Sequence, residues 1–315
     1  VVRTQGWVAF TSSESGFENA IVTSNGELLA MTTDTMNGMT LRSFPTGATR
    51  VDGNNNGDIT FGAFFDDGDT RIPFVSLNDQ VVVEGGDEVD GRTLELGHQQ
   101  SGPLIPRINE NGDLLFSALT AENGVSIFLN DQVLYEPGQV VGEFIVQGIG
   151  HLQHAFNNVG DVAWVADLQD SNGAGDPFVA LLVNERIVVR SDFPFDGHMV
   201  TSPAFDIAIN DQGNLLFSSM LDDARQAAFT DAGLVAKAGD TIDGFTIPQD
   251  PWFMLTNSSL NNAGEFVFAL NRDMVDPDAS AALFRGTIPI PEPSTICLIS
   301  LVGLFILQTR LRVGS

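Results

Sequence analysis

The chain consists of short apolar runs separated by polar turns, a pattern that predicts β-strands rather than helices. The phrase INENGDLLFSAL at residues 108–119 shows the unit, because a turn containing Asn and Gly leads straight into an apolar run. Clear copies of this phrase occur at 156–168, 209–221 and 260–270, and weaker copies occur at 5–13 and 53–64. The body of the chain is therefore a tandem repeat.

Each copy has one glycine at a fixed place in its turn. These anchor glycines lie about 50 residues apart, a period typical of propeller blades and other repeat folds, and they are Gly6, Gly57, Gly112, Gly160, Gly213 and Gly264. In five copies an asparagine lies three residues before the glycine, namely Asn54, Asn109, Asn157, Asn210 and Asn261. We expect the asparagine to bond the local backbone and the glycine to supply a positive φ, which makes both structural.

Further turn signals divide every repeat into four strands. In the third copy the anchor turn is followed by apolar runs at 114–116 and 125–129, a tight turn at Asn130-Asp131 and a third run at 133–135. A Gly-Asp or equivalent turn and a less regular fourth strand come next. Four strands in about 50 residues predict an all-β fold, a six-bladed β-propeller over residues 1–288. A stacked β-solenoid and a pair of sandwiches are the alternatives.

The two ends of the repeat array differ from its middle. After the second apolar run of the sixth copy, Arg285-Gly286 leads almost at once into a different kind of sequence, so full third and fourth strands do not fit. At the other end, Val1-Val2 stand where a fourth strand would finish. We therefore expect an incomplete final blade with an open edge. We also expect a native precursor that extends upstream of Val1 with a signal peptide and at least two more strands.

Composition excludes several partners and chemistries. Asp and Glu total 41 against 14 Lys and Arg, and this formal net charge of -27 argues against nucleic acid as a partner. The single cysteine, Cys297, lies in the terminal apolar run, so the repeats contain no disulfide, no Cys-based metal site and no thiol nucleophile. The sequence has neither a GxSxG motif nor a phosphate-binding glycine loop. No spacing singles out a carboxylate pair for glycoside hydrolysis.

The loop after the first strand of each repeat is acidic, and equivalent loops of a radial repeat lie on one face. The carboxylates proposed as metal ligands in this acidic rim are Asp66, Asp67, Asp69, Asp167, Asp170, Asp222, Asp223, Asp273, Asp276 and Asp278. Such a rim can hold Ca²⁺, which prefers oxygen ligands, or meet a cationic polymer. The alternative is a solubilising face that opposes aggregation. The four histidines are interpreted as neutral turn or rim residues rather than a metal site.

Residues 289–315 have a different character from the repeats. In order, they contain Pro291, Glu292 and Pro293, an apolar run from Ile296 to Leu307, and the basic residues Arg310 and Arg312. The run is shorter than the ~20 residues of a comfortable bilayer span, which indicates a short, transient transmembrane segment over 295–308. The positive-inside rule would keep the arginines cytoplasmic while the repeats face outward.

This order of parts resembles the PEP-CTERM sorting signal of Gram-negative bacteria. The resemblance implies a secreted protein that is anchored transiently in the inner membrane and then delivered to the cell surface or extracellular matrix. It also implies a partner, a membrane-embedded exosortase that recognises the Pro-Glu-Pro motif and removes the hydrophobic tail.

The repeat phrases resemble those of the NxxGxxAF tandem-repeat family of secreted bacterial proteins. The match is closest at 157–164, where Trp164 replaces Phe, and it departs in the first copy, where Arg3 stands in the asparagine position. The resemblance implies architecture and location but supplies no catalytic residues. We therefore expect a binding or structural protein of the exopolysaccharide envelope. The alternative is an extracellular glycan-active enzyme, a hydrolase or lyase, on a propeller scaffold.

Overall fold

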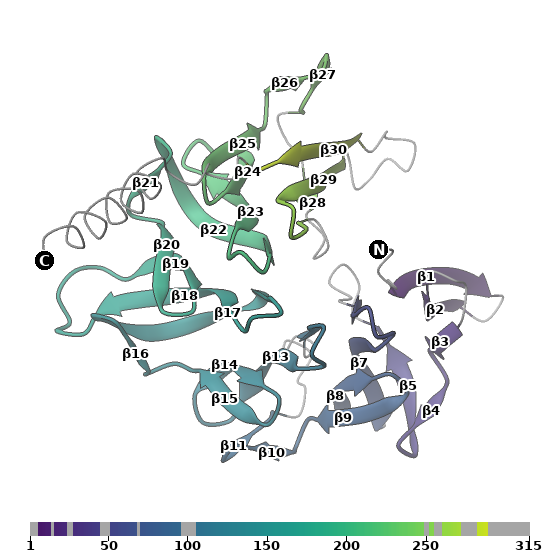
Figure 1. Cartoon of the computed structure of the whole chain (residues 1–315). Helices are drawn as coiled ribbons and strands as arrows, with labels where there is room; N and C mark the ends of the chain where they lie inside the picture. The colour runs from purple at the N-terminus through teal and green to yellow at the C-terminus, as the bar shows by residue number, and fades with distance from the viewer. Residues whose placement is uncertain are drawn as a thin grey trace, which may run out of the picture.

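The computed structural model describes residues 6–13, 16–23, 28–44, 51–67, 70–95, 105–248, 252–254, 260–271 and 282–288. The regular structure in these ranges consists of strands, which form six main sheets that follow one another around a common centre (Figure 1). The fold is all-β and propeller-like with six blades, which confirms the prediction from the repeats. The radial order is that of a propeller rather than of a stacked solenoid.

The first two sheets contain the N-terminal strands. The first sheet consists of β1 (Gly6–Ser13), β2 (Gly16–Thr23) and β3 (Leu28–Met31). The second consists of β4 (Thr35–Met36), β5 (Met39–Ser43), β6 (Val51–Gly53), β7 (Ile59–Asp67), β8 (Thr70–Leu77) and β9 (Gln80–Glu84). Both β5 and β6 pair with β7, so together they occupy the inner position of that sheet.

The next three sheets are the most regular, and all their strand pairs are antiparallel. The third contains β12 (Ile105–Ile108), β13 (Leu114–Thr120), β14 (Gly124–Leu129) and β15 (Gln132–Tyr135). The fourth contains β16 (Val140–Val141), β17 (Phe144–Phe156), β18 (Val162–Asp170), β19 (Phe178–Val183) and β20 (Arg186–Arg190). The fifth contains β21 (Pro194–Phe195), β22 (His198–Ile209), β23 (Leu215–Leu221), β24 (Gln226–Thr230) and β25 (Gly233–Lys237).

The sixth sheet has three strands in the part of the chain that the structure describes. It contains β28 (Trp252–Met254), β29 (Glu265–Asn271) and β30 (Ala282–Thr287). In the described residues β30 pairs only with β29, whereas the corresponding strands β8, β14, β19 and β24 each pair with a further outer strand.

A small hairpin connects each outer strand to the inner strand of the next sheet, a feature that the sequence analysis described only as a turn and an irregular strand. Two of these hairpins are separate sheets, formed by β10 (Glu88–Val89) with β11 (Arg92–Thr93) and by β26 (Thr241–Ile242) with β27 (Phe245–Thr246). The turns at Asp90-Gly91, Asp196-Gly197 and Asp243-Gly244 have positive φ at both residues, as a type I′ hairpin requires.

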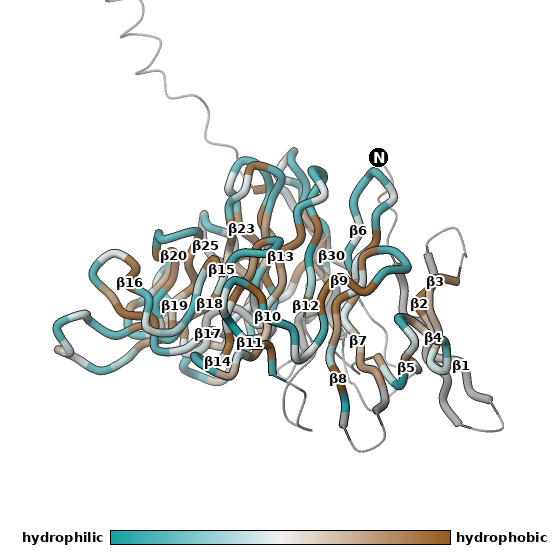
Figure 2. Tube along the Cα trace, turned by 90° about the horizontal axis from the view of Figure 1, so that it is seen from below, coloured by the Kyte–Doolittle hydropathy of each residue, from teal (hydrophilic) through white to brown (hydrophobic). Residues whose placement is uncertain are grey.

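The hydrophobic core lies between neighbouring sheets. One cluster joins Leu115 and Tyr135 of the third sheet to Trp164 and Leu182 of the fourth, and equivalent clusters lie between the other sheets that follow each other in the chain, from the first to the sixth. Figure 2 shows that the strands are mostly apolar and that the turns between them are mostly hydrophilic. Each blade therefore depends on its neighbours for burial, as is general for repeats whose single unit cannot cover its own apolar face.

Candidate binding site at the repeat axis

The anchor turns lie where the inner strands converge, and Asn157 shows how each turn is held. Its side-chain Oδ1 accepts hydrogen bonds from the backbone N–H groups of Val159 (3.2 Å) and Asp161 (2.8 Å). Gly160 has φ 94° and donates its N–H to the carbonyl of Asn157. Equivalent bonds occur at Asn54, Asn109, Asn210 and Asn261. The structural interpretation of the asparagines is therefore confirmed.

The same asparagines also connect successive repeats, which the sequence analysis did not predict. In each described pair, side-chain Nδ2 donates to the backbone carbonyl of the asparagine in the next repeat. The bonds run from Asn54 to Asn109 (3.1 Å), Asn109 to Asn157 (3.5 Å), Asn157 to Asn210 (2.9 Å) and Asn210 to Asn261 (3.0 Å). Four of these side chains are almost fully buried, so the bonds form a shielded asparagine ladder around the axis.

A second ring is formed by the residues that directly follow the ladder asparagines. These residues alternate between amide and carboxylate: Asn55, Glu110, Asn158, Asp211 and Asn262. Asn158 donates from its backbone N–H and from Nδ2 to the Asp211 carboxylate, at 2.9 and 3.0 Å. Asn55 binds Glu110 in the same way, at 2.8 Å for both bonds. Because Asn158 lies between Glu110 and Asp211, each of these two carboxylates faces hydrogen-bond donors rather than another negative group.

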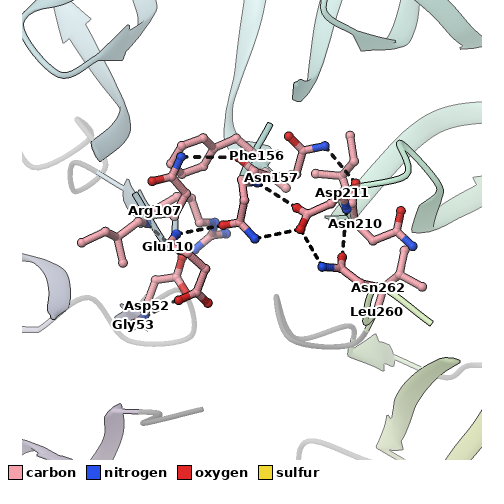
Figure 3. A pocket seen from close by; sticks show the side chains of 15 residues that line it. Asp52, Gly53, Arg107, Glu110, Phe156, Asn157, Asn210, Asp211, Leu260 and Asn262 are labelled. Carbon is pink, nitrogen blue, oxygen red and sulfur yellow. Dashed lines mark hydrogen bonds between the residues drawn. The ribbon is translucent and has the colours of Figure 1, made fainter. Parts of the chain in front are cut away.

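A cavity of about 40 Å³ lies between these turns, and Figure 3 shows the side chains that line it. Three of the lining residues are acidic, and each accepts a backbone N–H from an adjacent repeat: Asp52 from Ile108, Glu110 from Asn55, and Asp211 from Asn158. This volume holds one or a few water molecules.

Arg107 and His154 occupy the boundary between the third and fourth sheets. Arg107 is 2% exposed and its Nε lies 3.4 Å from the carbonyl of His154, while His154 Nε2 lies 2.9 Å from the carbonyl of Ile105. The expectation of four histidines in turns or on the rim is wrong for His154, which is 1% exposed. A buried imidazole between two strands needs a polar partner, and the Ile105 carbonyl provides one.

The described part of the acidic rim lies at the opposite end of the strands from the anchor turns. Asp167 and Asp170 are on β18, and Asp222 and Asp223 follow β23. Asp223 is bound by Arg225, whose hydrogen bond is the main cause of the lowered pKa of this carboxyl. Among the residues described, no three His, Cys, Asp or Glu side chains form a group that could hold a metal ion.

Several proposed ligands of the rim fall outside this description. Asp66 and Asp67 are within β7, but their side chains are not described, and Asp69, Asp273, Asp276 and Asp278 lie outside the described residues. Calcium binding therefore stays a prediction. The sorting motif, Pro291 to Pro293, and the arginines Arg310 and Arg312 also lie outside the described residues. Within the described ranges, no helix has the length and apolar character to cross a membrane.

Two titratable groups report on contacts between sheets. Burial against Trp164, with stacked ring centroids 4.1 Å apart, raises the pKa of Tyr135 to about 12. At the end of the same strand, Glu136 accepts two hydrogen bonds of 2.8 Å from Arg92 in the preceding hairpin. The hydrogen bond from Arg92 is the main cause of a lowered pKa of the Glu136 carboxyl, and Asn123 contributes in the same direction.

Neither a protein-family model nor a curated protein matches the chain. Among solved structures, the polysaccharide lyase Uly1 aligns with TM-score 0.42 and 7% identity, over 85% of this chain and 68% of that one. The Dos1 propeller aligns with TM-score 0.35 and 5% identity over 85% of this chain. The chain spans 61% of that propeller's own length.

Proposed function

We propose that this protein is a non-catalytic binding or structural component of the cell surface or exopolysaccharide matrix. The observation that carries the proposal is the use of the axial polar groups. The ladder asparagines and the three carboxylates that line the cavity bond to neighbouring repeats. The axis thus holds the blades together, and a polymer would meet the outer surface of the ring.

The tail supports delivery to that location. The Pro-Glu-Pro motif, the short apolar run and the terminal arginines occur in the order of an exosortase signal, with the repeats on the outward side. A net charge of -27 suits a hydrated extracellular matrix and opposes self-association. We infer that the protein is exported, held briefly in the inner membrane by its tail, and released after processing by an exosortase-type membrane protease.

The delivery step is tested by replacing Pro291, Glu292 and Pro293 with alanine in the native host. The variant should accumulate in the membrane fraction as a larger species, while wild type is processed and released. Pro289→Ala, just outside the motif, is the matched control and should be processed normally. Release of the triple variant with wild-type size and kinetics would show that the sorting hypothesis is wrong.

In this proposal, the carboxylates of the acidic rim bind a cation or a cationic polymer. Titration calorimetry with Ca²⁺ alone should give a binding isotherm, and millimolar Ca²⁺ should raise Tm, because a ligand that binds only the folded state stabilises it. If Ca²⁺ produces no heat of binding and no change in Tm, the rim is a solubilising face and the calcium hypothesis is wrong.

A further inference from the structure

The outer strands of the first five sheets each lead into a four-residue turn. In all five turns the backbone N–H of the fourth residue donates to the carbonyl of the first, and these pairs are Asp34 with Met31, Asp87 with Glu84, Gln139 with Glu136, Phe193 with Arg190 and Asp240 with Lys237. In four of the turns the side chain of the fourth residue also accepts the backbone N–H of the first. These bonds run from Met31 to Asp34 (2.7 Å), Glu84 to Asp87 (2.9 Å), Glu136 to Gln139 (3.3 Å) and Lys237 to Asp240 (3.0 Å). Bonds of this kind between a side chain and a nearby backbone group stabilise turns.

Phe193 is the exception, because a phenyl ring has no hydrogen-bond acceptor of this kind. The backbone bond of its turn is 3.4 Å long, compared with 3.0–3.2 Å in the other four turns. Burial does not compensate for the missing bond, since Phe193 is 66% exposed. A single exposed apolar side chain needs no explanation by itself. Here, however, it replaces a side chain that stabilises the same turn in the other four sheets, so phenylalanine at this position lowers the stability of the fold.

The rest of this turn presents fixed polar groups beside Phe193. Arg190 donates from Nε and Nη2 to the Asp192 carboxylate, at 2.9 and 2.7 Å. The Arg190 guanidinium also lies over the Phe178 ring, 3.8 Å from its centroid. Bidentate pairing and stacking fix the orientation of both charged groups, whose side chains are 33% and 46% exposed. The turn joins β20 to β21 at the outer side of the ring (Figure 1), so an exposed aromatic face lies there next to a donor and an acceptor.

The size of this apolar surface indicates the class of ligand. Among the described residues, the other exposed large apolar side chains each belong to a different strand or turn, and they are Leu28, Val82, Val140 and Val159. A protein partner requires a contiguous apolar patch, on the order of a few hundred Å². One phenyl ring beside a donor and an acceptor matches instead a pyranose unit, which has an apolar C–H face and hydroxyl groups around its edge.

We propose that the turn at residues 190–193 is a carbohydrate-binding subsite. The ring of Phe193 stacks on the C–H face of a pyranose unit, while Arg190 and Asp192 hydrogen-bond to its hydroxyl groups. Stacking removes the apolar faces of both rings from water, which favours binding. This inference rests on the proposed function and adds to it the class of ligand and the place of contact. A polysaccharide bound here lies along the outer surface of the ring, away from the asparagine ladder.

Phe193→Asn tests both parts of the argument, because asparagine removes the ring and restores an acceptor without changing the net charge. Its Tm should rise by about 2 °C, the effect of one additional turn hydrogen bond. Its affinity for the host's purified exopolysaccharide, measured by biolayer interferometry on the immobilised polymer, should fall about tenfold because one stacked apolar contact is lost. Phe193→Trp should retain the affinity, since it keeps a flat aromatic face. Val140→Asn is the matched control, because Val140 is an exposed apolar residue of the preceding hairpin, and it should leave the affinity unchanged.

Equal affinity of Phe193→Asn and wild type would overturn the subsite while leaving the proposed matrix function intact. A lower Tm of Phe193→Asn would show that the phenyl ring serves the fold, and would overturn the subsite as well. If wild type itself does not bind the exopolysaccharide, the proposed function is contradicted and the carbohydrate assignment fails with it. If wild type forms a dimer that Phe193→Asn dissociates, Phe193 contacts a second copy of the chain and the carbohydrate assignment is wrong.

Discussion

The side chain of Asn157 joins its own turn to that of the following repeat, because Nδ2 donates to the carbonyl of Asn210 at 2.9 Å while Oδ1 accepts two local N–H groups. One residue thus folds a turn and connects two blades that are 53 residues apart in the chain. The repetition of this arrangement from Asn54 to Asn261 explains why asparagine recurs at a position that forms no part of the apolar core.

Replacing Asn157 with alanine should lower the free energy of unfolding by about 3 kcal/mol, because two turn N–H groups and the Asn210 carbonyl lose a partner at a buried site. Asn172→Ala is a matched control, since Asn172 accepts a single N–H, from Ala174, in an exposed loop. The control should cost less than about 1 kcal/mol. Urea denaturation measures both changes, and equal small losses would contradict the role of the ladder.

The alternation of amides and carboxylates in the second ring predicts a charge-dependent defect. Asn158→Asp places a carboxylate beside Asp211 in place of a donor and should cost about 2 kcal/mol at neutral pH. Adding Asp211→Asn should recover part of this loss, because it restores a donor and an acceptor in the reverse order. A double-mutant cycle gives the coupling. Additive losses would show that the two side chains do not interact.

Tyr135 is the only tyrosine of the chain, so ultraviolet titration of phenolate formation reports on it alone. Its pKa of about 12, raised by burial, predicts no phenolate near pH 10 in the folded protein. Since the pKa is higher in the folded than in the unfolded state, this group stabilises the fold less as the pH rises from about 10 to 12. A titration midpoint near 10 under folded conditions would contradict the packing of Tyr135 on Trp164.

The pair formed by Arg92 and Glu136 predicts a loss of stability in acid. The folded-state pKa of Glu136 is lowered, so its contribution is present above the unfolded pKa of about 4.3 and is lost as the pH falls through the folded value. Glu136→Gln should flatten the decline of Tm with decreasing pH below about 5. Glu185→Gln, at an exposed hairpin turn, is the control and should leave the slope unchanged. Identical slopes for all three proteins would contradict this role of Glu136.

Local features of the fold could be predicted from the sequence, whereas contacts between repeats could not. The Asn and Gly of each anchor turn act within a few residues, so a repeated phrase was sufficient to place them. The bond from Asn157 to Asn210 joins different copies, and only the ring brings the two residues together. A signal for the second ring was present, however, in the alternation of amide and acid at residues 55, 110, 158, 211 and 262.

Other features were missed for identifiable reasons. The Asp-Gly pairs at 90–91, 196–197 and 243–244 are hairpin signals, but the sequence analysis described only one turn and an irregular strand in this part of each repeat. His154 was expected in a turn or on the rim together with the other three histidines, whereas the register of β17 places it in the space between two sheets. Burial of this kind depends on a bulged strand, which periodicity alone does not indicate.

The most direct test of the proposed function is the size of the host's purified exopolysaccharide after incubation with the protein, measured by size-exclusion chromatography with light scattering. A non-catalytic matrix protein should co-elute with the polymer and raise the mass of the polymer peak, without shortening the polymer at any incubation time. Progressive shortening of the polysaccharide would identify an enzyme. Elution of all the protein at its own mass, with the polymer unchanged, would contradict a role in binding this matrix.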